Sequence, residues 1–218
     1  MRGWTVIGGW ALSPEVLHPV FGTEGTTYVD LNGLAPRLVG ENGTLRADWR
    51  SRAREAVAGL LGEGSPGNLA GWSTGAMVAV SIAADLGVRR LVLLSAAGAL
   101  RWPARVLRGM RQRLAADRAG VVRDFLRRCG GTGEERPSSV PDGALAAGLI
   151  FLEHYCWGEG KLPLEGRVTV FHGRDDRVVP PGAGRDFARR IGAEFVEHPG
   201  GHLFFRDPGN ARAIRECL

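Results

Sequence analysis

The residue with the clearest chemical potential is Ser73, at the centre of the pentapeptide Gly71-Trp72-Ser73-Thr74-Gly75. An apolar run enters this pentapeptide and an alanine-rich run leaves it, which is the pattern of a strand, a sharp turn and a helix. Flanking glycines let the strand and the helix pass close together, and the start of the helix directs backbone N–H groups toward an oxyanion. The pattern predicts a nucleophilic serine; the alternative is a plain turn, since a chain with 33 glycines forms such pentapeptides by chance.

A serine nucleophile needs a base that removes its proton and an acid that orients the base. Asp176 follows a predicted strand at residues 167–173 and is the preferred acid, with its neighbour Asp175 as the rival. His202 lies in a glycine-flanked loop after the last predicted strand and is the preferred base. The order serine, acid, histidine predicts a catalytic triad, whereas a charged surface turn is the alternative for residues 174–177. The remaining histidines are expected to be structural: His18, His154, His172 and His198.

Acyl transfer also requires N–H donors for the oxyanion. We assign this role to the backbone N–H groups of Trp10, at the end of the first predicted strand, and of Thr74; an ordinary tight turn with a core tryptophan is the alternative at Trp10. Trp10, Trp72 and Phe125 are the predicted substrate-binding side chains, with the two tryptophans as apolar walls beside Ser73. The sequence has no phosphate-binding loop, dinucleotide fingerprint or Cys/His metal cluster, so we expect neither a cofactor nor a metal.

Strands and helices must alternate to place these groups at one edge of a sheet. The predicted strands are residues 4–10, 26–31, 68–73, 90–96, 167–173 and 194–197, and the predicted helices are 48–61, 74–86, 182–191 and 207–218. A loop rich in glycine and proline is expected after Asn32-Gly33. Residues 97–160 contain amphipathic helical stretches and no strand. The pattern predicts a single α/β domain, residues 1–218, in which helices cover both faces of a mostly parallel sheet and a helical lid follows the fourth strand.

Positive charge is concentrated in the predicted lid. The chain has 28 basic and 23 acidic residues, a net charge of +5. Residues 101–128 hold nine arginines and two acids, a local balance of +7 that leaves −2 for the rest of the chain. Such a surface suggests an acidic partner, although a solvated helix face is the alternative. The arginines that lie off the apolar stripes are the candidates for binding it: Arg105, Arg108, Arg111, Arg123 and Arg127. Nucleic acid is disfavoured as the partner because no aromatic residues are interleaved with these arginines.

The three cysteines, Cys129, Cys156 and Cys217, form an odd set without metal-like spacing, which favours a reducing compartment over a disulfide framework. The sequence begins directly with a strand-like run and lacks the longer apolar core of a signal peptide. The most apolar internal run, residues 77–84, is too short to span a bilayer. We therefore expect a cytoplasmic protein that does not bind membranes and that is a monomer.

Several motifs resemble the α/β-hydrolase superfamily and, more narrowly, the pimeloyl-[acyl-carrier-protein] methyl ester esterases of biotin synthesis. Residues 9–16 are similar to that family's oxyanion turn, residues 30–33 to its Asp-Leu-Pro-Gly, residues 71–73 to its elbow, and residues 106–132 to its lid. The spacing of residues 173–180 also matches and supports Asp176 over Asp175. Three positions depart from the family's pattern. Gly8 stands where these hydrolases commonly have a histidine, Ala76 stands where a second glycine often follows the elbow, and Thr74 stands where a larger apolar residue is usual.

This resemblance implies that the enzyme hydrolyses the methyl ester of a dicarboxylate that is thioester-linked to acyl carrier protein, with lid arginines holding the acidic carrier. Two alternatives stay open. The chain could be an esterase or thioesterase for small free acyl substrates, in which case the basic lid has no role in recognition. It could also be a non-catalytic carrier-binding module that keeps the fold.

Overall fold

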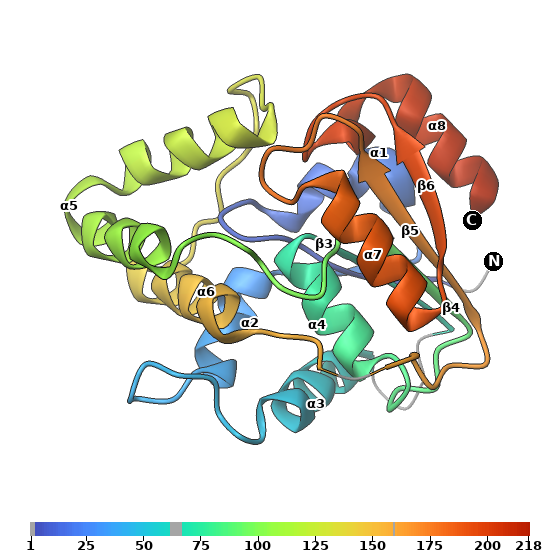
Figure 1. Ribbon diagram of the computed structural model, residues 1–218, viewed down its shortest axis with the longest axis horizontal. Helices are drawn as coiled ribbons and strands as arrows, with labels where there is room; N and C mark the ends of the chain where they lie inside the picture. Colours follow the sequence, from blue (N-terminus) through green and yellow to red (C-terminus); the bar gives the residue numbers. More distant parts are fainter. Residues whose placement is uncertain (1–2, 62–66, 159) are drawn as a thin grey trace.

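Six parallel strands form one sheet in the computed structural model, which describes residues 3–61, 67–158 and 160–218 (Figure 1). The strand order is β2-β1-β3-β4-β5-β6. The strand bounds are β1 Trp4–Ile7, β2 Thr26–Val29, β3 Asn68–Trp72, β4 Arg90–Leu94, β5 Arg167–Gly173 and β6 Glu194–His198. Because the strands are parallel, their carboxyl ends lie at one edge, where Ser73 and the loops after β5 and β6 begin. The α/β fold predicted from the alternating pattern is confirmed.

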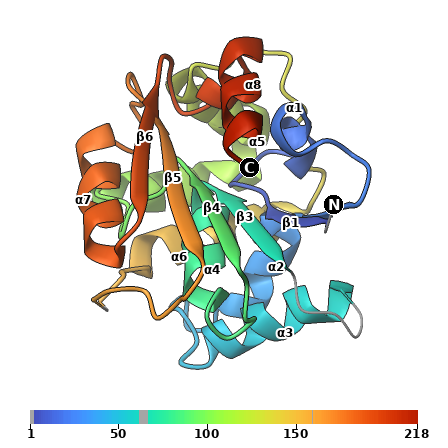
Figure 2. The ribbon, with the colours of Figure 1, turned by 90° about the vertical axis from the view of Figure 1, so that its right-hand side faces the viewer.

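Helices cover both faces of the sheet. Figure 2 shows α1 and α8 on one side and α3, α4 and α7 on the other. Their bounds are α1 His18–Phe21, α3 Trp49–Leu61, α4 Thr74–Ile82, α7 Pro181–Ile191 and α8 Pro208–Cys217, with short 3₁₀ helices η1 Pro14–Leu17 and η2 Phe204–Arg206. Within the described residues, no helix is both long enough and apolar enough to cross a membrane.

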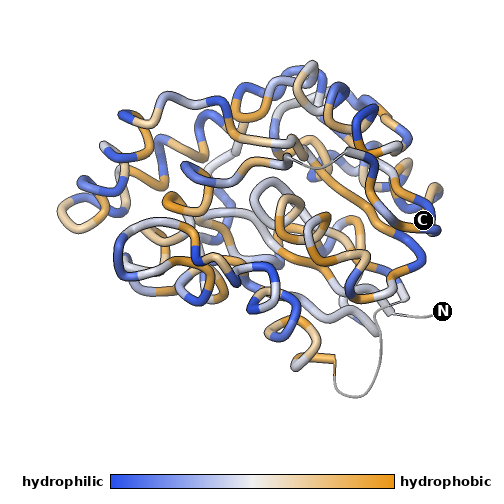
Figure 3. Tube along the Cα trace, turned by 60° about the horizontal axis from the view of Figure 1, so that its bottom comes forward, coloured by the Kyte–Doolittle hydropathy of each residue, from blue (hydrophilic) through white to orange (hydrophobic). Residues whose placement is uncertain are grey.

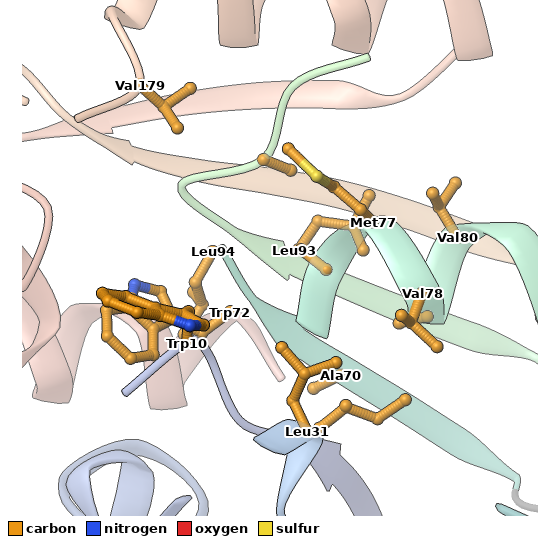
Figure 4. Close-up of a cluster of buried hydrophobic side chains, with 14 of the residues drawn as sticks. Trp10, Leu31, Ala70, Trp72, Met77, Val78, Val80, Leu93, Leu94 and Val179 are labelled. Atoms are coloured by element: carbon orange, nitrogen blue, oxygen red, sulfur yellow. The ribbon is translucent and has the colours of Figure 1, made fainter. Parts of the chain in front are cut away.

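The core lies between the sheet and these helices. The central strands are apolar on both faces, and Leu91, Leu93 and Leu94 of β4 have no exposed surface. Figure 3 shows extended hydrophobic stretches in the trace, while several helices alternate between hydrophobic and hydrophilic residues. Figure 4 shows side chains of α4 packed against those of β3 and β4. Burial of these apolar side chains fixes α4, and therefore its first turn, against the sheet.

The long insertion follows β4, as predicted, and consists of α5 (Ala104–Cys129) and α6 (Asp142–His154). Helix α5 bends at Asp117, whose backbone is not helical (φ −150°, ψ 61°). The Asp117 carboxylate accepts a hydrogen bond from the N–H of Gly120 (2.9 Å), so it caps the helix that starts again after the bend. We call residues 104–116 the first arm of α5 and residues 118–129 its second arm.

The loop expected after Asn32-Gly33 is a helix, α2 (Leu31–Leu38). Asp30 caps this helix by accepting a hydrogen bond from the N–H of Asn32 (2.8 Å), and the apolar side chains of α2 are buried beside α6. The prediction was wrong because it weighed Gly33 and Pro36 by their low intrinsic helix propensity. Packing of one apolar stripe against a distant helix outweighs that propensity.

Candidate active site

Ser73 lies in the sharp turn between β3 and α4. Its backbone has φ 55° and ψ −118°, a strained conformation for a residue with a side chain. A Cβ atom at Gly71 would lie 2.5 Å from the carbonyl oxygen of Gly75, and one at Gly75 would lie 2.2 Å from that of Gly8. Only glycine at these two positions lets the strand and helix approach this closely, which is the mechanical requirement predicted for the turn.

The three predicted triad residues form one hydrogen-bonded chain. His202 Nδ1 lies 2.7 Å from Asp176 Oδ2, and His202 Nε2 lies 2.8 Å from Ser73 Oγ. An ionised carboxylate only accepts hydrogen bonds, so Nδ1 carries the proton and Nε2 of the neutral ring accepts from the serine hydroxyl. His202 is fully buried, while Ser73 and Asp176 are each 5% exposed. This arrangement can take the proton from the Ser73 hydroxyl as its oxygen attacks an electrophile.

The structure brings Asp176, and not Asp175, to the histidine. The second oxygen of Asp176, Oδ1, accepts hydrogen bonds from the N–H groups of Val178 (2.8 Å) and Val179 (2.9 Å), which fix the carboxylate. Asp175 is exposed, and its carboxylate faces the N–H of Gly200 (3.3 Å). The two adjacent carboxylates therefore have different partners, and only one of them can orient His202.

A second imidazole contacts the same carboxylate. His172 Nε2 lies 3.3 Å from Asp176 Oδ2 and 2.9 Å from the carbonyl oxygen of Val179, so its N–H faces both acceptors. Burial alone would raise the pKa of Asp176, but the electrostatic attraction between the carboxylate and His202 and the hydrogen bonds from His172 and His202 outweigh burial and hold this pKa well below its ordinary value. Sequence reasoning gave His172 only a structural role and missed this contact, because nothing in the local sequence shows what a buried strand residue faces.

The lowered pKa of Asp176 predicts a pH-dependent contribution to stability. The ionised carboxylate is favoured in the folded state, so this contribution is present above the ordinary pKa of aspartate, about 3.9, and is lost as the pH falls from there toward the lower pKa of the folded state. We expect Asp176→Asn to lower the free energy of unfolding more at pH 7 than at pH 3. Urea unfolding of both proteins at pH 7, 5, 4 and 3 measures this difference, and an equal loss at every pH would contradict it.

Two side chains, one at the end of β3 and one directly after β4, hold the backbone of His202. Its carbonyl oxygen accepts hydrogen bonds from Trp72 Nε1 (3.1 Å) and from Ser95 Oγ (3.4 Å). Trp72 has no exposed surface and is not among the described residues that line the cavity at Ser73. The expectation that Trp72 forms a wall beside the nucleophile is corrected: because β3 side chains alternate between faces, Trp72 points away from the cavity and supports the histidine loop instead. Figure 4 shows it within the buried cluster.

The backbone N–H groups of Trp10 and Thr74 are available as donors, because neither has a hydrogen-bond acceptor in residues 3–61, 67–158 or 160–218. Ala11, next to Trp10, has φ 67°, which marks the tight turn of this segment. The buried side chain of Asn32 stabilises the turn by accepting from the N–H of Ala11 (2.9 Å) and donating to the carbonyl oxygen of Gly9 (3.3 Å). In the sequence, Asn32 belongs to a motif but has no predicted role of its own. Its role was missed because it depends on contacts with the distant residues Gly9 and Ala11.

The cavity at Ser73 is closed by the insertion. Trp10 and Phe125, two of the predicted substrate-binding residues, line it, and their rings pack edge to face with centroids 4.8 Å apart. Side chains that the sequence did not single out complete its wall: Met77, Leu100, Trp102, Leu107, Met110, Leu149, Leu152, Val178 and Val179. The free volume is only about 10 Å³, roughly that of one water molecule. The site is therefore apolar and shut, and an acyl chain can enter only if these side chains or the arms of α5 move.

The five candidate arginines all lie on α5 but differ in their partners. Arg108 and Arg111 pair with Glu153 of α6 (3.3 and 3.0 Å), and Arg127 pairs with Asp124 (3.4 Å). The other two, Arg105 and Arg123, are exposed and form no close ion pair in the described part of the chain. The structure also holds no group of three or more metal-ligating side chains in the residues it describes.

A family model described as the alpha/beta hydrolase family matches residues 3–213. The chain belongs to this family. No curated protein matches the sequence significantly. Solved structures of the same fold include a thermophilic esterase from Thermogutta terrifontis with malate bound, which is 21% identical with a TM-score of 0.70 over 100% of this chain and 89% of that one.

Two further structures are similar over nearly their whole length. An esterase from Exiguobacterium antarcticum is 15% identical, with a TM-score of 0.71 over 99% of this chain and 91% of that one. The thioesterase RedJ from the prodiginine biosynthetic pathway of Streptomyces coelicolor is 18% identical, with a TM-score of 0.66 over 99% of this chain and 89% of that one. At these identities the comparisons establish the hydrolase fold and leave the substrate open.

Proposed function

We propose that this hydrolase is a serine carboxylesterase in which Ser73, His202 and Asp176 act as the catalytic triad. The observation that carries this proposal is the buried hydrogen-bond chain from the Ser73 hydroxyl through His202 to Asp176, next to two N–H groups that have no acceptor among the described residues. Such a chain raises the reactivity of a hydroxyl that is otherwise a poor nucleophile at neutral pH.

The geometry supports a two-step reaction. Ser73 Oγ attacks the ester carbonyl while His202 Nε2 takes its proton, and the N–H groups of Trp10 and Thr74 stabilise the oxyanion. His202 then gives the proton to the departing alkoxide, which leaves as the alcohol and leaves an acyl group on Ser73. Water, deprotonated by His202, attacks this acyl group and releases the carboxylic acid, and the proton returns to Ser73. Asp176 stays ionised throughout and stabilises the imidazolium that forms in each step.

We further propose that the substrate is the methyl ester of a pimeloyl group carried on acyl carrier protein, and that hydrolysis supplies pimeloyl-carrier for biotin synthesis in the cytoplasm. The similarity of the oxyanion turn, elbow and lid to esterases of that pathway supports this substrate. The surplus of arginine on α5 supports an acidic partner, with Arg105, Arg123 and Arg127 exposed on one helix. Arg108 and Arg111 contribute less charge, since both pair with Glu153.

The closed cavity favours a second candidate function, hydrolysis of small free acyl esters or thioesters. A site with about 10 Å³ of free space needs less rearrangement for a short acyl chain than for a long one. The structural neighbours described above, two esterases and a thioesterase, also support an acyl hydrolase in the wider sense.

Comparison of carrier-linked with free substrate separates the two candidates. We expect kcat/KM for pimeloyl-carrier methyl ester to exceed that for free dimethyl pimelate, and to fall as salt rises, because screening shortens the range of charge attraction to about 8 Å near 0.15 M. We also expect the gene to restore growth without biotin to a strain that lacks the methyl ester esterase. Equal rates on carrier-linked and free esters at low salt would contradict carrier recognition and favour the small-substrate function.

Labelling with a fluorophosphonate probe tests whether the protein is catalytic at all. The probe is expected to modify Ser73 in the folded protein, since its phosphorus takes the place of the ester carbonyl carbon. Absence of labelling in a protein that still binds acyl carrier protein would instead support a non-catalytic carrier-binding module.

A further inference from the structure

A second cavity lies between the two arms of α5 and has a volume of about 280 Å³. The first arm contributes Arg105, Gly109 and Arg113 to its lining, and the second arm contributes Asp124 and Arg128. This cavity is large enough for a small polar group, in contrast to the closed space at Ser73.

The two cavities share a wall. Trp102, Met110 and Phe125 line both of them, so these three side chains separate Ser73 from the space between the arms. Trp102 is fixed from both sides: its indole N–H donates to the carbonyl oxygen of Val178 (3.0 Å), and the guanidinium of Arg128 lies 5.5 Å from its ring centroid. Movement of Met110 and Phe125 would therefore connect the two cavities.

The charge around the outer cavity is positive. Arg113 is already paired with Asp117 (3.2 Å) and Asp124 (3.4 Å). No carboxylate pairs with Arg105 or Arg128 within the described ranges, and both side chains are exposed. Two guanidinium groups without acidic partners, facing one cavity, suit a carboxylate or phosphate, which accepts two parallel N–H hydrogen bonds from each guanidinium.

We propose that the cavity between the arms of α5 binds an anionic group of the ester substrate through Arg105 and Arg128, while the acyl chain passes the wall of Trp102, Met110 and Phe125 to place its ester at Ser73. This inference rests on the proposed esterase function and names a substrate class for it: esters whose far end carries a negative charge. The charge could belong to a free carboxylate or to the phosphodiester of a carrier's prosthetic arm, and both have the oxygen geometry that the arginines recognise.

Matched esters test this subsite. The neutral substrate is p-nitrophenyl hexanoate, and its anionic match is the mono-p-nitrophenyl ester of adipate. The protein is compared with Arg105→Gln, Arg128→Gln, the double variant, and Arg212→Gln as a control, since Arg212 is an exposed arginine on α8. We expect the double variant to raise the ratio of KM for the anionic ester to KM for the neutral ester about fivefold or more at low salt, since loss of the Arg128 contact with Trp102 affects both esters equally. Thermal unfolding checks that each variant is folded.

A second pair of substrates identifies the source of the charge. Methyl adipoyl thioesters of 4′-phosphopantetheine and of pantetheine differ only in the phosphate. A KM effect confined to the phosphorylated thioester assigns the cavity to the phosphate, and one confined to the adipate ester assigns it to the carboxylate. Either result supports the subsite, whereas a double variant whose KM changes equally for charged and neutral esters contradicts it. If the unsubstituted protein hydrolyses none of these esters, the proposed esterase function fails, and this inference fails with it.

Discussion

Replacement of Ser73 by alanine is expected to lower kcat on p-nitrophenyl butyrate by about 10⁵-fold to 10⁶-fold, the loss seen when a triad nucleophile is removed from a serine hydrolase. Without the Ser73 Oγ atom, no covalent acyl intermediate forms. His202 Nε2 also loses the hydroxyl that lies 2.8 Å away and from which it takes the proton. The oxyanion donors and the bound ester remain, so a small residual rate above that of water is expected. Steady-state rates on the purified protein measure this change.

The fold is expected to survive this substitution. Alanine has the same backbone strain at φ 55° as serine, and the change removes only one buried hydrogen bond. Ser81→Ala is the matched control, because Ser81 lies on the same helix and its hydroxyl donates to the carbonyl oxygen of Met77 (2.8 Å). We expect full activity from this control. Activity of Ser73→Ala within tenfold of the unsubstituted protein would refute the assignment of the nucleophile.

Asp176→Asn is expected to lower kcat by about 10³-fold to 10⁴-fold at neutral pH. The Asp176 carboxylate accepts a hydrogen bond from the N–H at His202 Nδ1 (2.7 Å), which leaves Nε2 free to accept from Ser73. An amide N–H at this position donates to Nδ1 instead and favours the tautomer with its proton on Nε2, which cannot take the serine proton. The imidazolium formed during the reaction also loses its counter-charge.

The neighbouring Asp175→Asn provides the control for that prediction. Its charge and chain position are nearly the same, but its carboxylate is exposed and faces the N–H of Gly200. We expect its kcat to stay within about twofold, since exposed charge interactions contribute little. A larger loss of activity in Asp175→Asn than in Asp176→Asn would show that the two acids had been assigned the wrong way round.

The local sequence determined the parts of this protein that depend on neighbouring residues. Alternating apolar and amphipathic segments identified the strands and most of the helices, and the glycines around Ser73 identified the turn, because a Cβ atom at Gly71 or Gly75 would collide with the backbone. The same pattern placed Asp176 and His202 after strands, and parallel strands bring such positions to one edge. The order and approximate place of the candidate triad could therefore be predicted.

Only the tertiary structure decided which contacts those residues make. Trp72 supports the carbonyl oxygen of His202 across 130 positions, Asn32 stabilises the turn at Trp10, and His172 faces the carboxylate of Asp176. The helical conformation of α2 and the closure of the cavity by the arms of α5 likewise depend on packing between distant helices. These features could not be predicted from the sequence, because periodicity and spacing indicate only which face of a helix or strand is apolar. The partner that a buried polar side chain meets there is fixed only when the whole core packs.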